Sequence, residues 1–570
     1  MNNVERLGPE YRAAALRRLE QEELDVLVIG GGVVGAGSAL DAATRGLRVG
    51  LVEARDYAAG TSSRSSKLFH GGLRYLEQFD FGLVFEALRE RRLVLETLCP
   101  HLARPVPFVY PLQKRIDRAY VGLGIGVYDV MGAGRGVPGH HRHLGRRSTA
   151  ASFPSGKRSA IRGAVRFYEG QVDDARHTMM LARTAATYGA LCATSTRVTE
   201  FIRDADRIAG VRVRDLESGR ESTIRAQHVV NAAGIWTDEI QEMVGGRGQF
   251  QVRASKGVHL VVPRNRINSA TGVITRTEKS LLFIIPWGSH WIIGTTDTDW
   301  DLDLAHPAAS RTDIDYLLDH ANSLLQDPLT REDVVGVYAG LRPLLSGESE
   351  STSKLSREHA VASPVRGLTV IAGGKYTTYR VMAQDAVDSA VHDLERTVPP
   401  SVTDRTPLVG ADGYLAAHNA RRLTAERTGL PLSVVEHLLG RYGTLVGELF
   451  DLIAERPELA EPLASAPEYL KVEAAYAVSH EGALHLDDVL TRRTRISIEV
   501  PDRGAAAARE VADLVAPLLG WDAEHADREV DHYRLRVRAE RESQEKIDDR
   551  TADAARLGAP DVRMGATSTA

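Results

Sequence analysis

The sequence has almost no cysteine and no strong excess of either charge. Only Cys99 and Cys192 occur among its 570 residues, which excludes a disulfide framework and a cysteine-based zinc cluster. This scarcity fits a reducing cytoplasm. The formal net charge of -5 argues against a general nucleic-acid-binding surface, and so against nucleic acid as a partner.

Long hydrophobic runs are also missing. The longest charge-free apolar run near the start, residues 26–40, is rich in glycine and too short to cross a bilayer. Residues 1–23 contain acids and other charges, unlike a secretory signal. The sequence therefore predicts no membrane-spanning helix, whereas peripheral attachment to a membrane remains open.

What the chain has instead is a strand, a glycine-rich turn and a helix near its start. Residues 26–29 are apolar and mostly β-branched, as in a buried parallel strand, and residues 33–45 have a helical pattern. Gly30, Gly32 and Gly35 have the spacing G-x-G-x-x-G. In that motif the glycines permit a tight turn, the approach of a pyrophosphate, and close packing of helix on strand.

Two further features favour a dinucleotide at this turn. The helix would offer free N–H groups and the positive end of its dipole to phosphates, at Val33 and Val34. A second strand, residues 47–52, leads into Glu53, whose carboxylate can accept hydrogen bonds from ribose hydroxyls. The sequence thus predicts an adenine-dinucleotide site in an α/β fold with a Rossmann-like domain, and an ordinary strand–helix corner without a ligand is the alternative.

A serine-rich segment follows the second strand. Residues 61–74 contain four serines, one threonine, three cationic residues and one histidine. Hydroxyls and backbone N–H groups suit a loop wrapped along a dinucleotide, and cations suit an anionic cofactor or substrate. A solvated loop is the alternative, but Leu68, Phe69 and Leu73 would anchor the segment on a core.

The rest of the chain alternates between strands and helices before it becomes helical. Small residues follow the predicted strands at residues 227–231 and 368–372, where backbone can approach a ligand closely. Pro399 and Pro400 mark a linker, and residues 414–541 have a helical composition. Other predicted elements are helices at residues 81–98 and 173–188, a β-meander at 198–230, and strands of a second sheet at 258–263, 281–287 and 290–294.

Residues 131–168 contain eight Arg or Lys and no acid. A solvated face is the plainest interpretation of such a run. Attraction of an anionic substrate and contact with anionic lipid headgroups are the functional alternatives. The histidines within it have no acidic or cysteine companions nearby, so no metal site is expected.

A specific resemblance comes from the segment Ser62-Ser-Arg-Ser-Ser-Lys-Leu-Phe-His-Gly-Gly-Leu-Arg-Tyr-Leu-Glu. It resembles a hallmark of the FAD-dependent, quinone-linked glycerol-3-phosphate dehydrogenases, S-S-x-x-S-K-L-x-H-G-G-L-R-Y-L-E. The likeness runs from about residue 25 to residue 381 and more loosely beyond, with Tyr376 where Leu or Trp is commoner. Later blocks agree in order: Val172-Asp-Asp-Ala-Arg, Asn231-Ala-Ala-Gly-Ile-Trp, Ile293-Gly-Thr-Thr-Asp-Thr, Gly340-Leu-Arg-Pro-Leu and Gly373-Gly-Lys-Tyr-Thr-Thr-Tyr-Arg.

The resemblance implies FAD as cofactor and a fold of the two-dinucleotide-binding, D-amino-acid-oxidase-like type. The FAD-binding domain would be interleaved with a β-sheet substrate domain. The expected FAD-binding segments are about 25–99, 171–255 and 355–398, and the substrate-domain segments are about 100–170 and 256–354. An N-terminal extension (1–24), a helical C-terminal domain (399–541) and a disordered tail (542–570) complete the expected organisation.

The resemblance also implies the site. The expected catalytic residues are His70, Arg74, Arg342 and Lys375, and His70 is the preferred base because a histidine accepts protons near neutrality. A role for His70 in packing beside the flavin is the alternative. The substrate would contact Arg74, Tyr75, Thr296, Arg342 and Lys375, with Asp297 orienting one of them. The cofactor would contact Gly30, Gly32, Val33, Val34, Gly35, Glu53, Thr61, Ser62, Ser63, Ser66, Lys67, Leu68, His70, Gly71, Ala233, Gly234, Trp236, Gly373, Gly374, Lys375, Thr377 and Thr378.

The activity implied is oxidation of sn-glycerol 3-phosphate to dihydroxyacetone phosphate, by hydride transfer from C2 to flavin N5 and onward passage of electrons to a membrane quinone. This belongs to glycerol and glycerophospholipid catabolism. Such enzymes lie on the inner face of the cell membrane, so an anionic lipid surface and a second copy in a homodimer are expected partners. The alternatives are an oxidase that uses oxygen, an amine or amino-acid oxidase, and a non-catalytic flavin-binding sensor.

Overall fold

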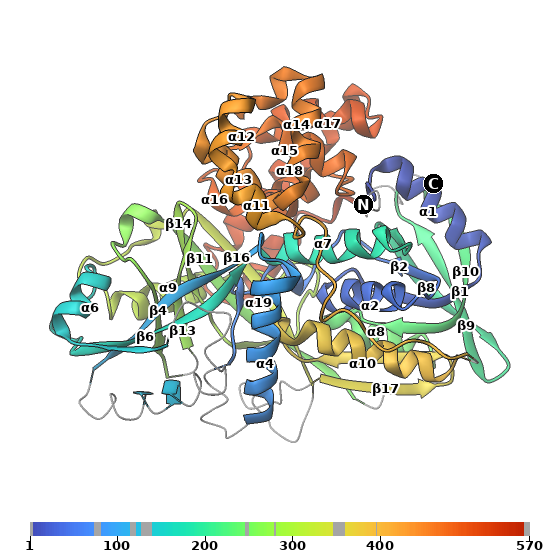
Figure 1. Cartoon of the computed structure of the whole chain (residues 1–570), viewed down its shortest axis with the longest axis horizontal. Helices are drawn as coiled ribbons and strands as arrows, with labels where there is room; N and C mark the ends of the chain where they lie inside the picture. The colour runs from blue at the N-terminus through green and yellow to red at the C-terminus, as the bar shows by residue number, and fades with distance from the viewer. Residues whose placement is uncertain are drawn as a thin grey trace.

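Two sheets lie side by side beneath a group of C-terminal helices (Figure 1). This arrangement comes from a computed structural model. It describes residues 4–563 except 73–80, 114–120, 123, 127–139, 246–249, 279–280, 346–358 and 395.

The first sheet has the predicted glycine-turn strand at its centre. β1 (Leu24–Ile29) pairs in parallel with β2 (Val49–Val52) and with β10 (Glu221–Asn231). The meander predicted at residues 198–230 is confirmed, since β8 and β9 pair in antiparallel fashion and lead into β10. The other strands of this sheet are β7 (Leu191–Ala193), β8 (Thr196–Asp204), β9 (Arg207–Asp215), β17 (His359–Val365) and β18 (Leu368–Gly373).

Both faces of β1 are buried, which explains its continuous apolar sequence. Val26 and Val28 belong to the core that contains α2, α7 and α10, whereas Leu27 and Ile29 pack with α1 and the meander. Successive side chains of a strand point to opposite faces, so the apolar residues of β1 pack into two different cores. The helices concerned are α1 (Pro9–Gln21), α2 (Val33–Thr44), α7 (Asp174–Thr187) and α10 (Tyr379–His392).

The second sheet is mostly antiparallel and contains the strands predicted at residues 258–263, 281–287 and 290–294. α9 (Arg311–Asn322) packs on it and begins with a capping box at Ser310. The strands are β3 (Leu68–Phe69), β4 (Ala103–Leu112), β5 (Arg142–Leu144), β6 (Gly163–Val172), β11 (Val252–Pro263), β12 (Gly272–Arg276), β13 (Leu281–Trp287), β14 (His290–Gly294), β15 (Thr298–Trp300) and β16 (Gly336–Leu345).

The helix predicted at residues 81–98 is present as α4 (Phe81–Leu93) followed by the π-helical turn η2 (Val94–Leu98). α4 lies between the two sheets in the view of Figure 1, and buried ion pairs at 2.7 Å join its Glu90 to Arg380 of α10 and its Arg91 to Glu169 of β6. A short helix, α6 (Arg146–Ser152), lies at the end of the second sheet. None of the helices in the described ranges is long and apolar enough to cross a membrane.

The region after residue 399 is helical, as its composition indicates. Part of it packs around a separate core that includes Val511 and Val530, whereas Val435 and Leu438 belong to the core that contains α2 and α7. It also contains one small hairpin, β19 (Pro462–Leu463) with β20 (Ala466–Leu470). Its helices include α11 (Tyr414–Asn419), α12 (Arg421–Thr428), α13 (Leu432–Tyr442), α14 (Val446–Glu455), α15 (Lys471–Ser479), α16 (Ile496–Glu499), α17 (Ala507–Leu519) and α18 (Ala523–Ser543).

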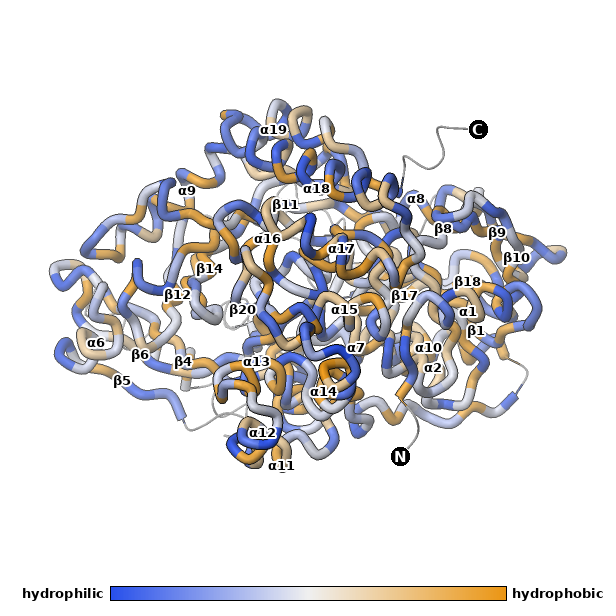
Figure 2. Tube along the Cα trace, turned by 90° about the horizontal axis from the view of Figure 1, so that it is seen from above, coloured by the Kyte–Doolittle hydropathy of each residue, from blue (hydrophilic) through white to orange (hydrophobic). Residues whose placement is uncertain are grey.

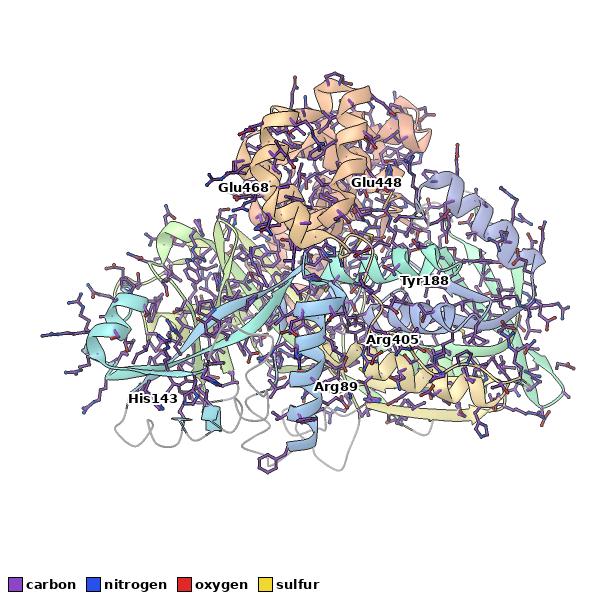
Figure 3. All side chains as sticks on the ribbon, viewed as in Figure 1. Arg89, His143, Tyr188, Arg405, Glu448 and Glu468 are labelled. Atoms are coloured by element: carbon purple, nitrogen blue, oxygen red, sulfur yellow. The ribbon has the colours of Figure 1, made fainter. Side chains whose placement is uncertain are left out.

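Ion pairs join this helical region to the first sheet. Glu448 lies in the helices above α7 (Figure 3) and accepts from Arg183 at 2.9 Å. Arg176 and Glu481 form a fully buried pair at 2.7 Å, and Arg495 contacts Asp174 at 2.6 Å. Removing one member of a buried pair would leave an uncompensated charge, at a cost of about 3–5 kcal/mol. The helical region is therefore tightly coupled to the α7 layer.

The expectation of a disordered tail is wrong for residues 542–563. α18 continues to Ser543, and α19 (Asp549–Arg556) lies beside α18 when the molecule is seen from above (Figure 2). The polar composition indicated disorder, but charged side chains of this segment form ion pairs with the rest of the protein, such as Asp549 with Lys256 at 2.5 Å. Ala552, in the middle of α19, is completely buried.

Candidate active site

A cavity of about 990 Å³ is lined by residues of both sheets. Its volume is at the upper end of the range usual for ligand pockets. Most of the residues predicted to form the site line it. These are Gly30, Gly32, Val33, Val34, Glu53, Thr61, Ser62, Ser66, Leu68, His70, Ala233, Gly234, Trp236, Arg342, Gly373, Gly374 and Lys375.

The glycine turn brings α2 directly onto the end of β1. A Cβ added to Gly35 would lie 1.9 Å from the carbonyl oxygen of Gly30, so only glycine permits this packing. Gly30 itself has a φ of +108°, which side chains rarely adopt. Gly32 faces the cavity, and the atom nearest to its added Cβ is Ser62 Oγ at 3.3 Å. The turn therefore places the start of α2, at Gly32, Val33 and Val34, on the wall of the cavity.

Two side chains complete this end of the cavity. Ser62 Oγ accepts a hydrogen bond from the Val33 amide at 2.9 Å. The Glu53 carboxylate accepts from the amides of Gly31 at 2.6 Å and Arg55 at 2.8 Å. Burial raises the pKa of Glu53. Each carboxylate oxygen can accept a second hydrogen bond, so a fixed Glu53 still offers acceptors to ribose hydroxyls.

The serine-rich segment is held from behind. Lys67 is fully buried with a φ of +56°, and its Nζ donates to Asp174 at 2.8 Å and to the Ser63 carbonyl at 3.1 Å. Ser65 Oγ donates to the same Asp174 at 2.7 Å. Lys67 and Ser63 thus lie outside the cavity lining, and the observed contacts of Lys67 shape the loop.

The other predicted residues outside the lining make contacts within the protein. Gly35 lies beneath the turn. Thr377 Oγ1 donates to the His70 carbonyl at 3.0 Å, and Thr378 Oγ1 donates to the Lys375 carbonyl at 3.5 Å. The Gly71 amide donates to Glu169 at 3.4 Å. Arg74 and Tyr75 lie outside the described residues.

Arg342, which the resemblance assigns to the substrate, lies inside β16. Its Nη2 donates to Thr295 Oγ1 at 3.1 Å and to the Thr296 carbonyl at 3.2 Å, and its Nη1 lies 3.5 Å from Asp297. A Cβ at Gly257 would lie 2.6 Å from Nη2, so glycine leaves the space for this guanidinium. Thr296 and Asp297 therefore orient Arg342, and Thr296 Oγ1 is occupied by the Val258 amide.

Lys375 follows β18, as the sequence predicted, and is 9 % exposed. It comes after Gly373 and Gly374, whose φ values of +79° and +75° turn the chain sharply. The 3-10 turn η7 (Tyr376–Thr378) then leads into α10. The Thr377–His70 bond joins this turn to the end of the serine-rich segment. Lys375 and His70 thus line the same cavity from two elements that are bonded together.

His259 is a lining residue that the sequence did not single out. Its Nε2 lies 2.8 Å from Ser66 Oγ, and its ring stacks on Tyr338 with centroids 4.7 Å apart. Burial lowers its pKa well below the usual value, and the cations Arg342 and Lys67 add to this effect. The ring is therefore neutral near neutral pH. A lone histidine within an apolar strand carries no motif that would have identified it.

Other unforeseen lining residues lie near Glu53. Arg55 and Arg64 both donate to the Ala305 carbonyl at 3.3 Å, and Arg55 lies over the Trp236 ring at 5.0 Å. Burial and neighbouring cations, Arg55 first among them, lower the pKa of Arg64 to about 9. Asp561 also lines this part of the cavity.

The cavity thus offers two kinds of chemistry. Near the turn, α2 amides, a serine hydroxyl and a carboxylate suit the phosphates and ribose of a dinucleotide. Near β16 and β18, a planar guanidinium and an ammonium suit a phosphate or a developing negative charge. No group of residues in the described ranges could hold a metal ion.

Comparison with known proteins agrees with this geometry. A family model of FAD-dependent oxidoreductases matches residues 25–380, and a model of the C-terminal domain of alpha-glycerophosphate oxidase matches residues 401–526. The glycerol-3-phosphate dehydrogenase of Mycobacterium leprae is 60% identical over 558 residues, covering 98% of this chain and 95% of the relative. The human mitochondrial glycerol-3-phosphate dehydrogenase is 34% identical over 541 residues, covering 91% of this chain and 74% of the relative.

Solved structures show the same fold. The glycerol-3-phosphate dehydrogenase from Bacillus halodurans complexed with FAD has a TM-score of 0.77 at 29% identity, covering 93% of this chain and 98% of that one. The L-alpha-glycerophosphate oxidase from Mycoplasma pneumoniae has a TM-score of 0.54 at 18% identity, over 68% of this chain and 99% of that one. The predicted fold class and FAD as cofactor are therefore confirmed.

Proposed function

Because the chain belongs to the glycerol-3-phosphate dehydrogenase family of FAD-dependent oxidoreductases, we propose that it oxidises sn-glycerol 3-phosphate to dihydroxyacetone phosphate. The observation that carries this proposal is the presence of Arg342 and Lys375 on one cavity with the glycine turn of the dinucleotide site. Two cations beside the cofactor favour a phosphate-bearing substrate over the single carboxylate of an amino acid.

The cations bind and orient the substrate. Arg342 is held by Thr295, the Thr296 carbonyl and Asp297, so its planar fork is preorganised before the substrate arrives. Lys375 is nearly buried and adds a second positive charge. Its ammonium is a compact point charge, so it does not require the phosphate to approach in one plane as a guanidinium does. Bound FAD supplies the acceptor for the hydride from C2. The protein's task is to hold C2 against the flavin and to stabilise the charge that develops on the C2 oxygen.

His70 is the proposed base for the C2 hydroxyl proton. It lines the cavity, and its carbonyl is tied to the turn that follows Lys375. His259 is a poorer base, because a proton on its ring would be buried beside Arg342 and Lys67. A neutral His259 instead holds Ser66 through Nε2, and its Nδ1 is buried.

The test is anaerobic mixing of the FAD-loaded protein with glycerol 3-phosphate, with flavin absorbance followed near roughly 450 nm. We expect rapid bleaching with glycerol 3-phosphate and none with glycerol or NADH. The control with glycerol removes only the phosphate, so it isolates the contribution of the cations. A yellow protein that glycerol 3-phosphate does not bleach would contradict the proposed substrate.

We further propose that a membrane quinone takes up the electrons at the inner face of the cell membrane. Phe81 and Phe85 are 47 % and 57 % exposed on one face of α4, and Arg89 follows one turn later on the same helix (Figure 3). The end of α4 that carries them projects beyond the sheets (Figure 1). Exposed aromatic rings next to a cation are typical of a surface that enters a lipid interface.

This surface can be tested with vesicles of anionic phospholipid that contain a quinone. The double variant Phe81→Ser/Phe85→Ser should bind the vesicles at least about tenfold more weakly, since burying each ring is worth up to ~2 kcal/mol and ~1.4 kcal/mol corresponds to a factor of ten. Its anaerobic bleaching should stay normal, whereas quinone reduction in the vesicles should fall. The matched control is Leu423→Ser, which removes an apolar side chain that is 67 % exposed on α12. Equal vesicle binding by the double variant and the wild type would exclude α4 as the contact.

An oxidase is the second candidate, supported by the match of residues 401–526 to the C-terminal domain of alpha-glycerophosphate oxidase. Readmitting oxygen to the bleached protein separates the two. Fast return of the yellow colour with release of hydrogen peroxide would favour the oxidase, and slow return that a quinone accelerates would favour the dehydrogenase. Association into a homodimer stays a prediction.

A further inference from the structure

The C-terminal segment beyond α18 reaches the FAD cavity. We call residues 545–563 the C-terminal strap; it contains α19 and the turn that follows. Leu557, Ala559, Pro560 and Asp561 of the strap line the cavity. Neither matching family model includes the strap, since the second ends at residue 526. The strap therefore lines a part of the cavity that neither family model describes.

The strap is anchored on both sides of its cavity-lining residues. On one side, Asp549 accepts from the buried Lys256 of β11 at 2.5 Å, and Ala552 packs in a small core with Trp300. On the other side, Arg563 donates to Ser195 Oγ at 2.6 Å and to Asp488 at 2.9 Å. The Arg563 guanidinium is buried, so its hydrogen bonds to Ser195 and Asp488 are shielded from water.

These contacts place the strap at the adenosine side of the cavity. Arg55 Nη1 lies 3.9 Å from Asp561, and Arg55 comes two residues after Glu53, the acid positioned for the ribose. Ser195, the anchor of Arg563, directly precedes Thr196, which lines the cavity. The cations Arg563 and Arg55 lower the pKa of Asp561 although burial opposes this, so Asp561 is ionised and can only accept hydrogen bonds.

We propose that the strap supplies cofactor-binding residues, with Ala559, Pro560 and Asp561 covering the adenosine part of FAD. Ala559 and Pro560 exclude water from the cofactor, and Asp561 offers an acceptor to an adenosine hydroxyl or amino group. The strap and FAD then stabilise each other. FAD contacts the strap only when the strap is docked on the cavity, so bound FAD must favour the docked position.

The first experiment measures FAD release from Arg563→Ala. Flavin fluorescence rises when FAD leaves the protein, and we expect release to be about tenfold faster because two charge-assisted hydrogen bonds of the anchor are lost. Asp488 keeps its ion pair with Arg492 at 2.5 Å, so the variant retains a partner for that buried carboxylate. The matched control, Arg550→Ala, removes an exposed arginine of α19 and should release FAD at the wild-type rate.

The second experiment uses the wild-type chain, so it does not depend on how a variant folds. Trypsin can cut the strap after Lys546, Arg550, Arg556 and Arg563. FAD should slow these cuts about tenfold relative to the apoprotein, while cuts in α12, far along the chain at Arg427, should change little. Equal cleavage of the strap with and without FAD, or equal FAD release by the Arg563 and Arg550 variants, would overturn the proposal. Neither measurement involves glycerol 3-phosphate, so its outcome is independent of the proposed reaction.

Discussion

Replacing Arg342 by alanine is expected to lower kcat/KM for glycerol 3-phosphate by about a thousandfold, or ~4 kcal/mol of transition-state stabilisation. The guanidinium is preorganised by Thr295 and Asp297, so the wild type makes this interaction without a further ordering cost. Alanine would leave Asp297 without its cation, and that negative charge would repel the substrate phosphate. The rate of anaerobic flavin bleaching at several substrate concentrations measures the effect.

Two further variants show whether the loss of kcat/KM in Arg342→Ala comes from the guanidinium itself. Arg342→Lys keeps the charge but not the planar fork, so it should recover only part of the activity. Arg253→Ala removes a half-exposed arginine of β11, the strand that pairs with β16, and should leave kcat/KM unchanged. FAD content should be the same in all three proteins, because Arg342 contacts the substrate end of the cavity. A loss of less than tenfold in Arg342→Ala would remove Arg342 from the proposed phosphate site.

Parts of this site were predictable from the sequence because local geometry alone requires them. Gly30 and Gly35 are needed for the turn and for the helix above it, whatever the remainder of the chain does. Lys375 follows two glycines after a buried strand, a pattern that marks a chain turning at a sheet edge. Arg342 was identified by resemblance, but its position within β16 depends on pairing with β11, which is a long-range contact.

Other features depend on contacts that no local pattern records. His259 lines the cavity because β11 pairs with β14 and β16, which sets the face toward which its ring points. Lys67 belongs to a motif that suggested cofactor binding, yet its ammonium is buried against Asp174, more than a hundred residues away. The ordered structure of residues 542–563 likewise results from ion pairs with distant residues such as Lys256 and Asp488. Composition described these charges correctly but could not show that they are paired.

Substituting Gly35 by alanine is expected to abolish tight FAD binding. The added Cβ would lie 1.9 Å from the Gly30 carbonyl, and backbone must move to relieve the contact. Helix propensity alone would make the variant more stable, because alanine within a helix is favoured over glycine by about 1 kcal/mol. A loss of binding would therefore report the steric conflict between α2 and β1. We expect the affinity for FAD to fall by at least about a hundredfold, because α2 amides and Ser62 would no longer meet the phosphates together.

The matched control is Gly440→Ala, which makes the same change within α13. An added Cβ there meets nothing within 4 Å, so the gain in helix propensity should appear alone, as a stabilisation of up to ~1 kcal/mol. The two variants are compared by the ratio of flavin to protein absorbance after purification and by titration of the apoproteins with FAD. If Gly35→Ala binds FAD as tightly as Gly440→Ala, the glycine turn does not hold the cofactor phosphates, since a turn displaced by the new Cβ could not have kept its N–H groups in place.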